Sequence, residues 1–171
     1  MADTTITADH GKQEILIERE LDYPRDLVFR CHVHSELMVQ WMGPRDLETT
    51  FTYLEAKPGG SYRFTQRDPK GGEFSFHGVY HEVKSPQLII DTFEYEDTPQ
   101  HVSLITQTFE ELADRRSKVR QQSLFQSVAD RDAMLDSGMR AGIIEGYERL
   151  DELLEKLSNE AELRETRRDH I

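Results

Sequence analysis

Residues 127–157 read SVADRDAMLDSGMRAGIIEGYERLDELLEKL. At roughly 100° per residue, the large apolar side chains of this stretch fall on one face of a helix. This stripe comprises Leu135, Met139, Ile143, Tyr147, Leu150, Leu153, Leu154 and Leu157. Gly142 and Gly146 lie within it and Gly138 lies at its edge, although each interior glycine costs about 1 kcal/mol relative to alanine. We therefore expect one long helix whose glycine face either packs closely against a sheet or helps to shape a ligand cavity.

The sequence before this helix alternates strand-like segments with turn signals. Apolar alternation and turn residues predict strands at 13–21, 47–54, 61–67, 73–83, 88–95, 102–112 and 118–125. Two short helices are expected after the first strand, at 24–32 and 36–42. The connections between the later strands are short, so neighbouring strands should pair antiparallel. This order predicts an α+β domain whose long helix buries its stripe on one face of the sheet.

Composition narrows the classes of function. A chain of 171 residues fits one domain with a substantial core. The formal net charge is −12 and no basic cluster offsets it, which argues against binding to nucleic acid or to anionic membranes. Cys31 is the only cysteine, so no internal disulfide can form. Residues 1–10 show no signal-peptide pattern and no apolar run reaches membrane-spanning length, so we expect a soluble cytoplasmic protein.

Sequence motifs for catalysis or metal binding are missing. The chain contains no G-x-S-x-G, H-E-x-x-H, P-loop or G-x-G-x-x-G pattern. His77 and His81 lie four positions apart on an expected strand, about 13 Å, which is too far for one metal ion to bind both. Cys31 is expected to be a buried structural thiol. Four carboxylates near strand ends are expected to be solvated, although any of them could act as a general base if it were buried in a pocket: Glu55, Asp91, Glu94 and Glu96.

Several short motifs together resemble one known family. They are YPRDLVF at 23–29, WMGP at 41–44, EAKPGGSYRF at 55–64, GVYHEV at 78–83, TFEE at 108–111 and SGMRAG at 137–142. Their order and spacing are similar to those of the activator of heat-shock-protein-90 ATPase homologue family, within the START-like (SRPBCC) superfamily. The resemblance covers about residues 13 to 157.

This resemblance implies a helix-grip fold of the START-like, birch-allergen-like kind. Such a fold has a curved antiparallel sheet of about six or seven strands around the C-terminal helix, with two short helices after the first strand and a cavity between sheet and helix. It divides the chain into a flexible N-terminus (1–12), a START-like domain (13–158) and a charged C-terminal tail (159–171).

Strand alternation predicts which side chains line that cavity. Tyr62 and Phe64 share one face of their strand, and the stronger apolar face of 73–83 carries Phe76 and Tyr80. Tyr53 is expected to point inward from the preceding strand, and Trp41 to close one end. The helix adds the remaining members of the apolar set: Met139, Gly142 and Ile143. Aromatic walls of this kind are typical of small-molecule sites, although each ring could equally fill a core.

Two glutamines are unusual in this lining. If Phe109 and Val119 point inward, alternation directs Gln107 and Gln121 inward too. The family generally places aliphatic residues at these positions. An unpartnered buried amide costs roughly 1–3 kcal/mol, so the two glutamines should bond each other, face cavity water or meet a polar group of a ligand. The alternative is that they lie on an exposed edge strand.

Three classes of function stay open. We favour a binding module for a small hydrophobic or amphipathic molecule, without catalysis, cofactor or metal. A protein-interaction module is the second class. The co-chaperone that gives the family its name carries an additional N-terminal domain, however, and only 12 residues precede the first expected strand here, so a chaperone partner is not expected. The third is an enzyme resembling cyclases, dehydratases or hydrolases of aromatic or polyketide substrates. A homodimer stays open; membrane insertion is not expected.

Overall fold

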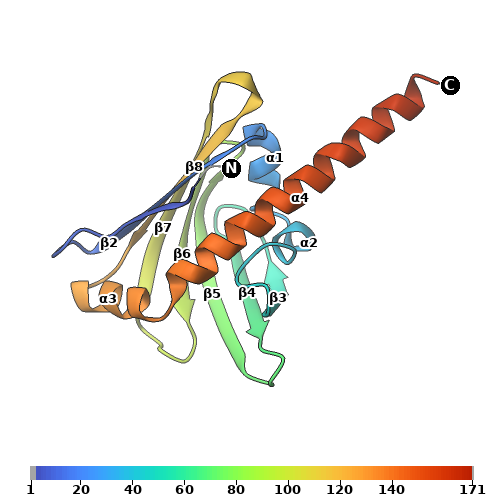
Figure 1. Ribbon diagram of the computed structural model, residues 1–171. Coiled ribbons are helices and arrows are strands. Elements are labelled where there is room, and N and C mark those ends of the chain that lie inside the picture. The colour runs from blue at the N-terminus through green and yellow to red at the C-terminus, as the bar shows by residue number, and fades with distance from the viewer. Residues whose placement is uncertain (1–2, 171) are drawn as a thin grey trace.

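The computed structural model describes residues 3–170 and shows an α+β fold (Figure 1). One curved antiparallel sheet of eight strands has the order β1-β2-β8-β7-β6-β5-β4-β3. The strands are β1 (Thr5–Thr7), β2 (Glu14–Leu21), β3 (Glu48–Leu54), β4 (Ser61–Arg67), β5 (Glu73–Lys84), β6 (Leu88–Tyr95), β7 (Val102–Glu111) and β8 (Ser117–Leu124). The predicted fold class is confirmed, with one strand more than expected.

Among the described residues, three helical segments connect strands, and two helices follow the last strand. They are α1 (Arg25–Arg30), α2 (Ser35–Met38), the 3-10 turn η1 (Ala113–Arg115), α3 (Val128–Asp136) and α4 (Met139–Arg168). The two short helices α1 and α2 connect β2 to β3, as predicted. Figure 1 shows α4 crossing the sheet diagonally and continuing beyond it.

The prediction of one uninterrupted helix over 127–157 is wrong, because the chain forms α3 and α4 with a break at Gly138. Gly138 has a φ of 84°, in the left-handed region that glycine adopts at little cost. Ser127 begins α3 by accepting a hydrogen bond from the backbone N–H of Asp130 at 3.0 Å. Gly138 therefore sets the start and direction of α4 rather than forming part of its apolar stripe.

Both ends of the chain carry more regular structure than the sequence indicates. Thr5–Thr7, within the segment expected to be flexible, pair antiparallel with β2, and the Arg19 guanidinium donates to the Thr4 hydroxyl at 3.0 Å. Helix α4 continues to Arg168, eleven residues past Leu157, through a run rich in the helix formers Glu, Leu and Arg. Residues 1–2 and 171 of the two predicted terminal segments lie outside the described residues.

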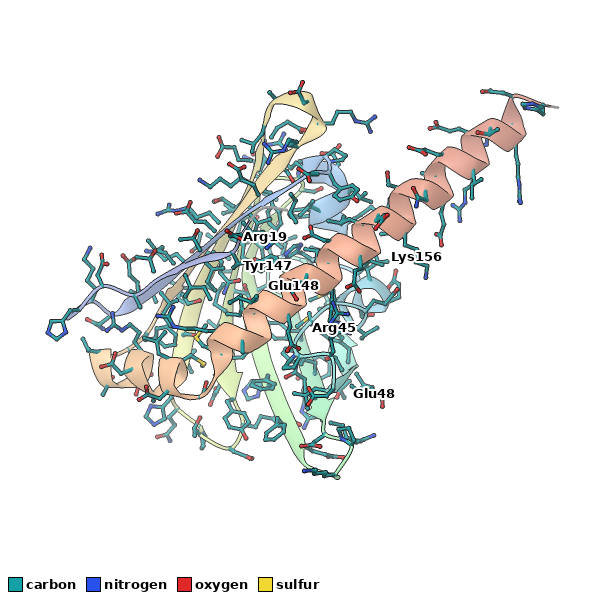
Figure 2. All side chains as sticks on the ribbon, in the orientation of Figure 1. Arg19, Arg45, Glu48, Tyr147, Glu148 and Lys156 are labelled. Carbon is teal, nitrogen blue, oxygen red and sulfur yellow. The ribbon has the colours of Figure 1, made fainter. Side chains whose placement is uncertain are left out.

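The core lies between the sheet, α1 and the middle of α4. Its fully buried side chains include Ile15, Ile17, Val28, Val119, Leu150 and Leu154. Arg19 of β2 is itself buried and forms an ion pair with Asp151 of α4, at the place where Figure 2 labels Arg19 and Tyr147 together. This pair and the apolar stripe fix α4 at the β2 side of the sheet. The second half of the predicted apolar stripe, around Leu150 and Leu154, thus does pack against the sheet.

Candidate functional site

A cavity of about 460 Å³ lies between the sheet and the first half of α4. Its lining comes from the inward faces of the strands, the 41–47 loop and the α3–α4 junction. Ten of the eleven predicted site residues are among the residues that line it: Trp41, Tyr62, Phe64, Phe76, Tyr80, Gln107, Gln121, Met139, Gly142 and Ile143. Sequence alternation therefore located most of the wall, and whether these residues bind a ligand stays a prediction.

Tyr53 is the exception, and the expectation that it points inward is wrong. The register between β3 and β4 shifts after the pair Phe51–Phe64, so that Tyr53 comes to lie opposite Arg63. This β-bulge leaves Thr52 as an extra residue and reverses the alternation beyond it. Phe51, which precedes the bulge, lines the cavity, whereas the Tyr53 side chain after the bulge is 46% exposed.

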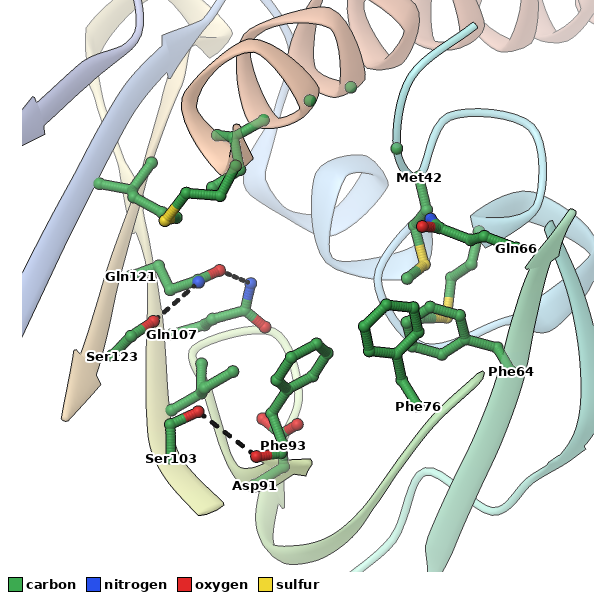
Figure 3. Close-up of a pocket in the computed structure, with 18 of the residues that line it drawn as sticks. Met42, Phe64, Gln66, Phe76, Asp91, Phe93, Ser103, Gln107, Gln121 and Ser123 are labelled. Carbon is green, nitrogen blue, oxygen red and sulfur yellow. Dashed lines mark hydrogen bonds between the residues drawn. The ribbon is translucent and has the colours of Figure 1, made fainter. Parts of the chain in front are cut away.

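One wall of the cavity consists of aromatic rings from three neighbouring strands, β4, β5 and β6. The Phe64 and Phe76 rings stack with their centroids 5.0 Å apart, and the Phe76 and Phe93 rings stack at 5.2 Å (Figure 3). The Tyr62 and Tyr80 rings lie in the same wall, with their centroids 5.4 Å apart. Such offset pairs are more favourable than area burial alone. The wall is thus a rigid apolar surface suited to a flat or aliphatic body.

Polar side chains form a strip along the inward faces of β7 and β8, facing this wall. Gln107 lies opposite Gln121 in the ladder, and its Nε2 donates to Gln121 Oε1 at 3.0 Å. Gln121 Nε2 in turn donates to the Ser123 hydroxyl at 3.2 Å (Figure 3). The Ser103 hydroxyl donates to the backbone oxygen of Phe93 at 3.4 Å. The two glutamines therefore bond each other within the cavity, one of the arrangements expected, and do not lie on an edge strand.

Asp91 contributes the one carboxyl group among the described lining residues. It lies on β6 between the inward-facing Ile89 and Phe93, and it is only 8% exposed. The expectation that it is solvated is wrong. Burial raises the pKa of Asp91 to about 7, opposed in part by the neighbouring Tyr62 hydroxyl. The alternation of Ile89, Asp91 and Phe93 is the sequence signal that could have identified it.

The loop Trp41–Pro44 closes the cavity against α4, and the helix glycines allow this contact. A Cβ atom on Gly142 would lie 3.5 Å from Pro44 Cγ, and one on Gly146 would lie 3.3 Å from the Trp41 backbone oxygen. Close packing explains these glycines, but the partner is the loop rather than the sheet. Both glycines also line the cavity. The glycine face of the helix therefore both packs closely against a neighbouring segment and helps to shape the cavity.

Arg149 of α4 binds the same loop through its guanidinium group. Its Nη1 donates to the backbone oxygen of Gly43 at 3.0 Å, and its Nη2 donates to that of Gln40 at 3.0 Å. Longer bonds of 3.3 Å reach the oxygens of Met42 and Pro44. The Trp41 indole N–H donates to the Cys31 backbone oxygen at 2.9 Å, which fixes the other side of the loop. The loop is therefore a fixed wall of the cavity.

Two other titratable groups near the cavity, His32 and Cys31, are neutral and enclosed. His32 is buried, its Nδ1 hydrogen-bonds the Val28 oxygen at 2.8 Å, and burial lowers its pKa to about 4. Burial raises the pKa of the Cys31 thiol to about 11, so it is an unreactive buried thiol as expected. Within residues 3–170, no group of three His, Cys, Asp or Glu side chains is arranged to hold a metal ion.

A curved sheet that holds a C-terminal helix across an internal cavity defines a helix-grip domain of the START-like superfamily. The chain belongs to the family described as Activator of Hsp90 ATPase homolog 1-like protein, whose model matches residues 22–155. This confirms the resemblance drawn from the short motifs. No functionally curated protein matches the chain significantly in sequence.

Solved structures support the same fold. A crystal structure of a Rhodobacter sphaeroides protein matches with a TM-score of 0.82 at 19% identity, covering 90% of this chain and 99% of that one. A solution structure of an Arthrobacter aurescens protein gives 0.81 at 21% identity, covering 89% and 91%. A Staphylococcus epidermidis protein gives 0.76 at 26% identity, covering 89% and 94%. In the described part of this chain, no helix is both long enough and apolar enough to cross a membrane.

Proposed function

We propose that this protein binds a small hydrophobic or amphipathic molecule, without chemical conversion, in the cavity between the sheet and α4. The observation that carries the proposal is the lining: a stacked aromatic wall on β4–β6 opposite a hydrogen-bonded polar strip on β7 and β8. An apolar enclosure with a few convergent polar groups is the usual form of a small-molecule site. A volume of about 460 Å³ suits one molecule of modest size.

The ionisable groups of the lining favour binding over catalysis. Apart from tyrosines, the described lining residues include one carboxyl, Asp91, and one imidazole, His32. The His32 ring packs against the Trp41 and Phe109 rings, and burial lowers its pKa to about 4, so it is a weak base. General acid–base catalysis usually needs a proton donor and acceptor within reach of the substrate. The described groups beside Asp91 are the Tyr62 and Tyr80 hydroxyls, and burial raises the pKa of both, which makes them poor proton donors.

The test measures uptake of a neutral apolar fluorophore, N-phenyl-1-naphthylamine, by the whole chain. Ile143 lines the cavity, whereas its neighbour Ile144 is 39% exposed on the same helix. Ile143→Trp should fill the space and weaken uptake at least about tenfold, roughly 1.4 kcal/mol. The matched variant Ile144→Trp should leave uptake unchanged. Equal uptake by both folded variants, or none by the wild type, would contradict the proposal. Native mass spectrometry of protein purified from cells should also show a co-purifying small molecule.

A further inference from the structure

The Gln107 and Gln121 amides each use one of their two N–H donors on a protein acceptor, and the cavity lining also keeps free acceptor oxygens. The described hydrogen bonds pass from Gln107 to Gln121 and on to Ser123, so Gln107 Oε1 receives no donor from the described residues. The Tyr62 hydroxyl has a single proton, and it donates this proton to the backbone oxygen of Thr92 at 2.6 Å. The Asp91 carboxyl, which lies beside the same hydroxyl, therefore shares this single proton with the Thr92 oxygen.

The Asp91 carboxyl also has no cation nearby. Lys and Arg are missing from the described lining residues, although the lining is drawn from almost every strand. The titratable groups that pack around Asp91 are Tyr62 on β4 and Tyr80 on β5. Asp91 pairs with Tyr80 in the β5–β6 ladder. A buried carboxylate is costly unless a positive partner and hydrogen bonds compensate it, and the described lining residues include no Lys or Arg to pair with it.

Asp91 and Gln107 project into the same space from adjacent strands (Figure 3). In the β6–β7 ladder, Asp91 lies opposite Ile105 and Gln107 lies opposite Ile89, so the two polar residues are diagonal neighbours. Diagonal neighbours on one sheet face are about 7–8 Å apart, within reach of one small polar group between them. The rings of Phe76 and Phe93, which stack on each other, also line the cavity and offer the body of a bound molecule an apolar surface.

We propose that the molecule bound in the cavity is an amphipathic amine, whose protonated nitrogen pairs with the Asp91 carboxylate and whose apolar body lies against the aromatic wall. Gln107 Oε1 is the second acceptor for the ammonium hydrogens. This inference rests on the proposed binding function and narrows its ligand class. Molecules that end in a carboxylate or phosphate are disfavoured, because Asp91 repels them and the described lining offers them no cation.

The experiment compares three dansyl probes that differ at one end of a five-carbon chain. Dansylcadaverine ends in an amine, N-pentyl dansylamide ends in a methyl group, and dansyl-6-aminohexanoic acid ends in a carboxylate. Each is titrated by fluorescence against wild-type protein, Asp91→Asn and a matched control, Glu94→Gln. Glu94 is on the same strand, but its carboxylate contacts His77 at 3.3 Å and the Gln100 backbone N–H at 2.8 Å, and it is not among the lining residues.

The wild type should bind the amine probe at least about tenfold more tightly than the methyl probe, since hydrogen bonds between charged groups are stronger than those between neutral groups. Asp91→Asn should remove that preference while binding of the methyl probe stays, and Glu94→Gln should keep it. The wild-type ratio alone tests the inference if a variant fails to fold. Equal binding of the amine and methyl probes overturns the amine inference and leaves the cavity proposal standing. Failure of all three probes to bind overturns both.

Discussion

Gln107 Nε2 donates to Gln121 Oε1 at 3.0 Å, and this bond joins β7 to β8 on the face of the sheet that borders the cavity. Each amide thereby satisfies part of the other's hydrogen-bonding capacity in a largely apolar surrounding. The relationship predicts that the two positions are energetically coupled, because removing one partner leaves a polar group unmet whereas removing both does not.

We therefore expect Gln107→Leu alone to lower the free energy of unfolding by about 1–3 kcal/mol. The double variant Gln107→Leu/Gln121→Leu should lose less than the sum of the two single variants. Urea unfolding of the four proteins gives the coupling energy. Strict additivity would contradict the coupling. The double variant should also shift binding towards purely apolar probes, and an unchanged ranking across a probe panel would show that the polar strip does not select ligands.

The two glycines that contact the Trp41–Pro44 loop should respond oppositely to alanine. In Gly142→Ala the new methyl meets Pro44 at an ordinary contact distance of 3.5 Å, so the gain in helix propensity of about 1 kcal/mol should stabilise the fold. In Gly146→Ala the methyl comes within 3.3 Å of the Trp41 backbone oxygen, which should cancel or reverse that gain. Thermal unfolding of both variants measures the difference, and equal shifts in Tm would contradict it.

A larger side chain at Gly142 tests its place in the cavity. Gly142→Leu should overpack the space beside Pro44 and lower stability by about 1–3 kcal/mol, or reduce uptake of N-phenyl-1-naphthylamine. Arg140→Leu, an exposed position on the same helix, is the matched control. A Gly142→Leu protein with wild-type stability and uptake would show that this helix face does not border the binding space.

The raised pKa of Asp91 predicts a pH dependence of stability with a definite sign. Its pKa rises from 3.8 in its ordinary state to about 7 in the fold. Between these values the folded protein holds a proton that the unfolded chain has released, so this group's contribution to stability falls as pH rises through 4 to 7. A shift of roughly three pKa units corresponds to at most about 4 kcal/mol.

His32 contributes a slope of the opposite sign. Burial lowers its pKa from 6.5 to about 4, so the unfolded chain binds the extra proton and stability rises across that window. The wild type should therefore show a flatter profile than Asp91→Asn, which keeps only the rising His32 contribution. Urea unfolding at intervals from pH 4 to 8 measures both profiles. A constant difference between the two proteins over this range would contradict the buried, partnerless carboxyl.

Replacing Arg149 should lower the free energy of unfolding, even when the replacement is lysine. Its guanidinium donates to four backbone oxygens, those of Gln40, Met42, Gly43 and Pro44. A lysine ammonium is a compact donor group and cannot span all four. Arg149→Lys should lower stability by about 1–3 kcal/mol, whereas Arg140→Lys at an exposed position should change little. Equal unfolding midpoints of the two variants would contradict the role of Arg149 in holding the loop.

The sequence predicted the fold and most of the cavity wall because both depend on local periodicity. Tyr62, Phe64, Phe76 and Tyr80 lie inward because alternation along regular strands persists. Tyr53 was misplaced because a bulge is a property of two paired strands, and neither strand alone reveals the shift.

The remaining errors have equally specific causes. Gly138 breaks the helix through its positive φ, which an apolar stripe that continues on both sides does not disclose. Asp91 is buried beside Tyr62 and Tyr80, which come from other strands, and this contact is not visible in the sequence around Asp91. Residue type alone favoured solvent for this carboxylate. Periodicity thus located the aromatic wall, Gln107 and Gln121, whereas contacts between distant segments decided Tyr53 and Asp91.

The hydrogen bonds from Arg149 to the 41–44 loop and Gln40 join a permanent cation to uncharged backbone oxygens. Burial lowers the pKa of Arg149 from its ordinary value, but the guanidinium stays charged at every pH that cells maintain. Partly buried contacts are also screened by dissolved salt less than exposed ion pairs are. The cavity should accordingly keep its volume as pH and salt concentration change. Such a change should alter which ligands the cavity binds, and not the size of ligand that it accepts.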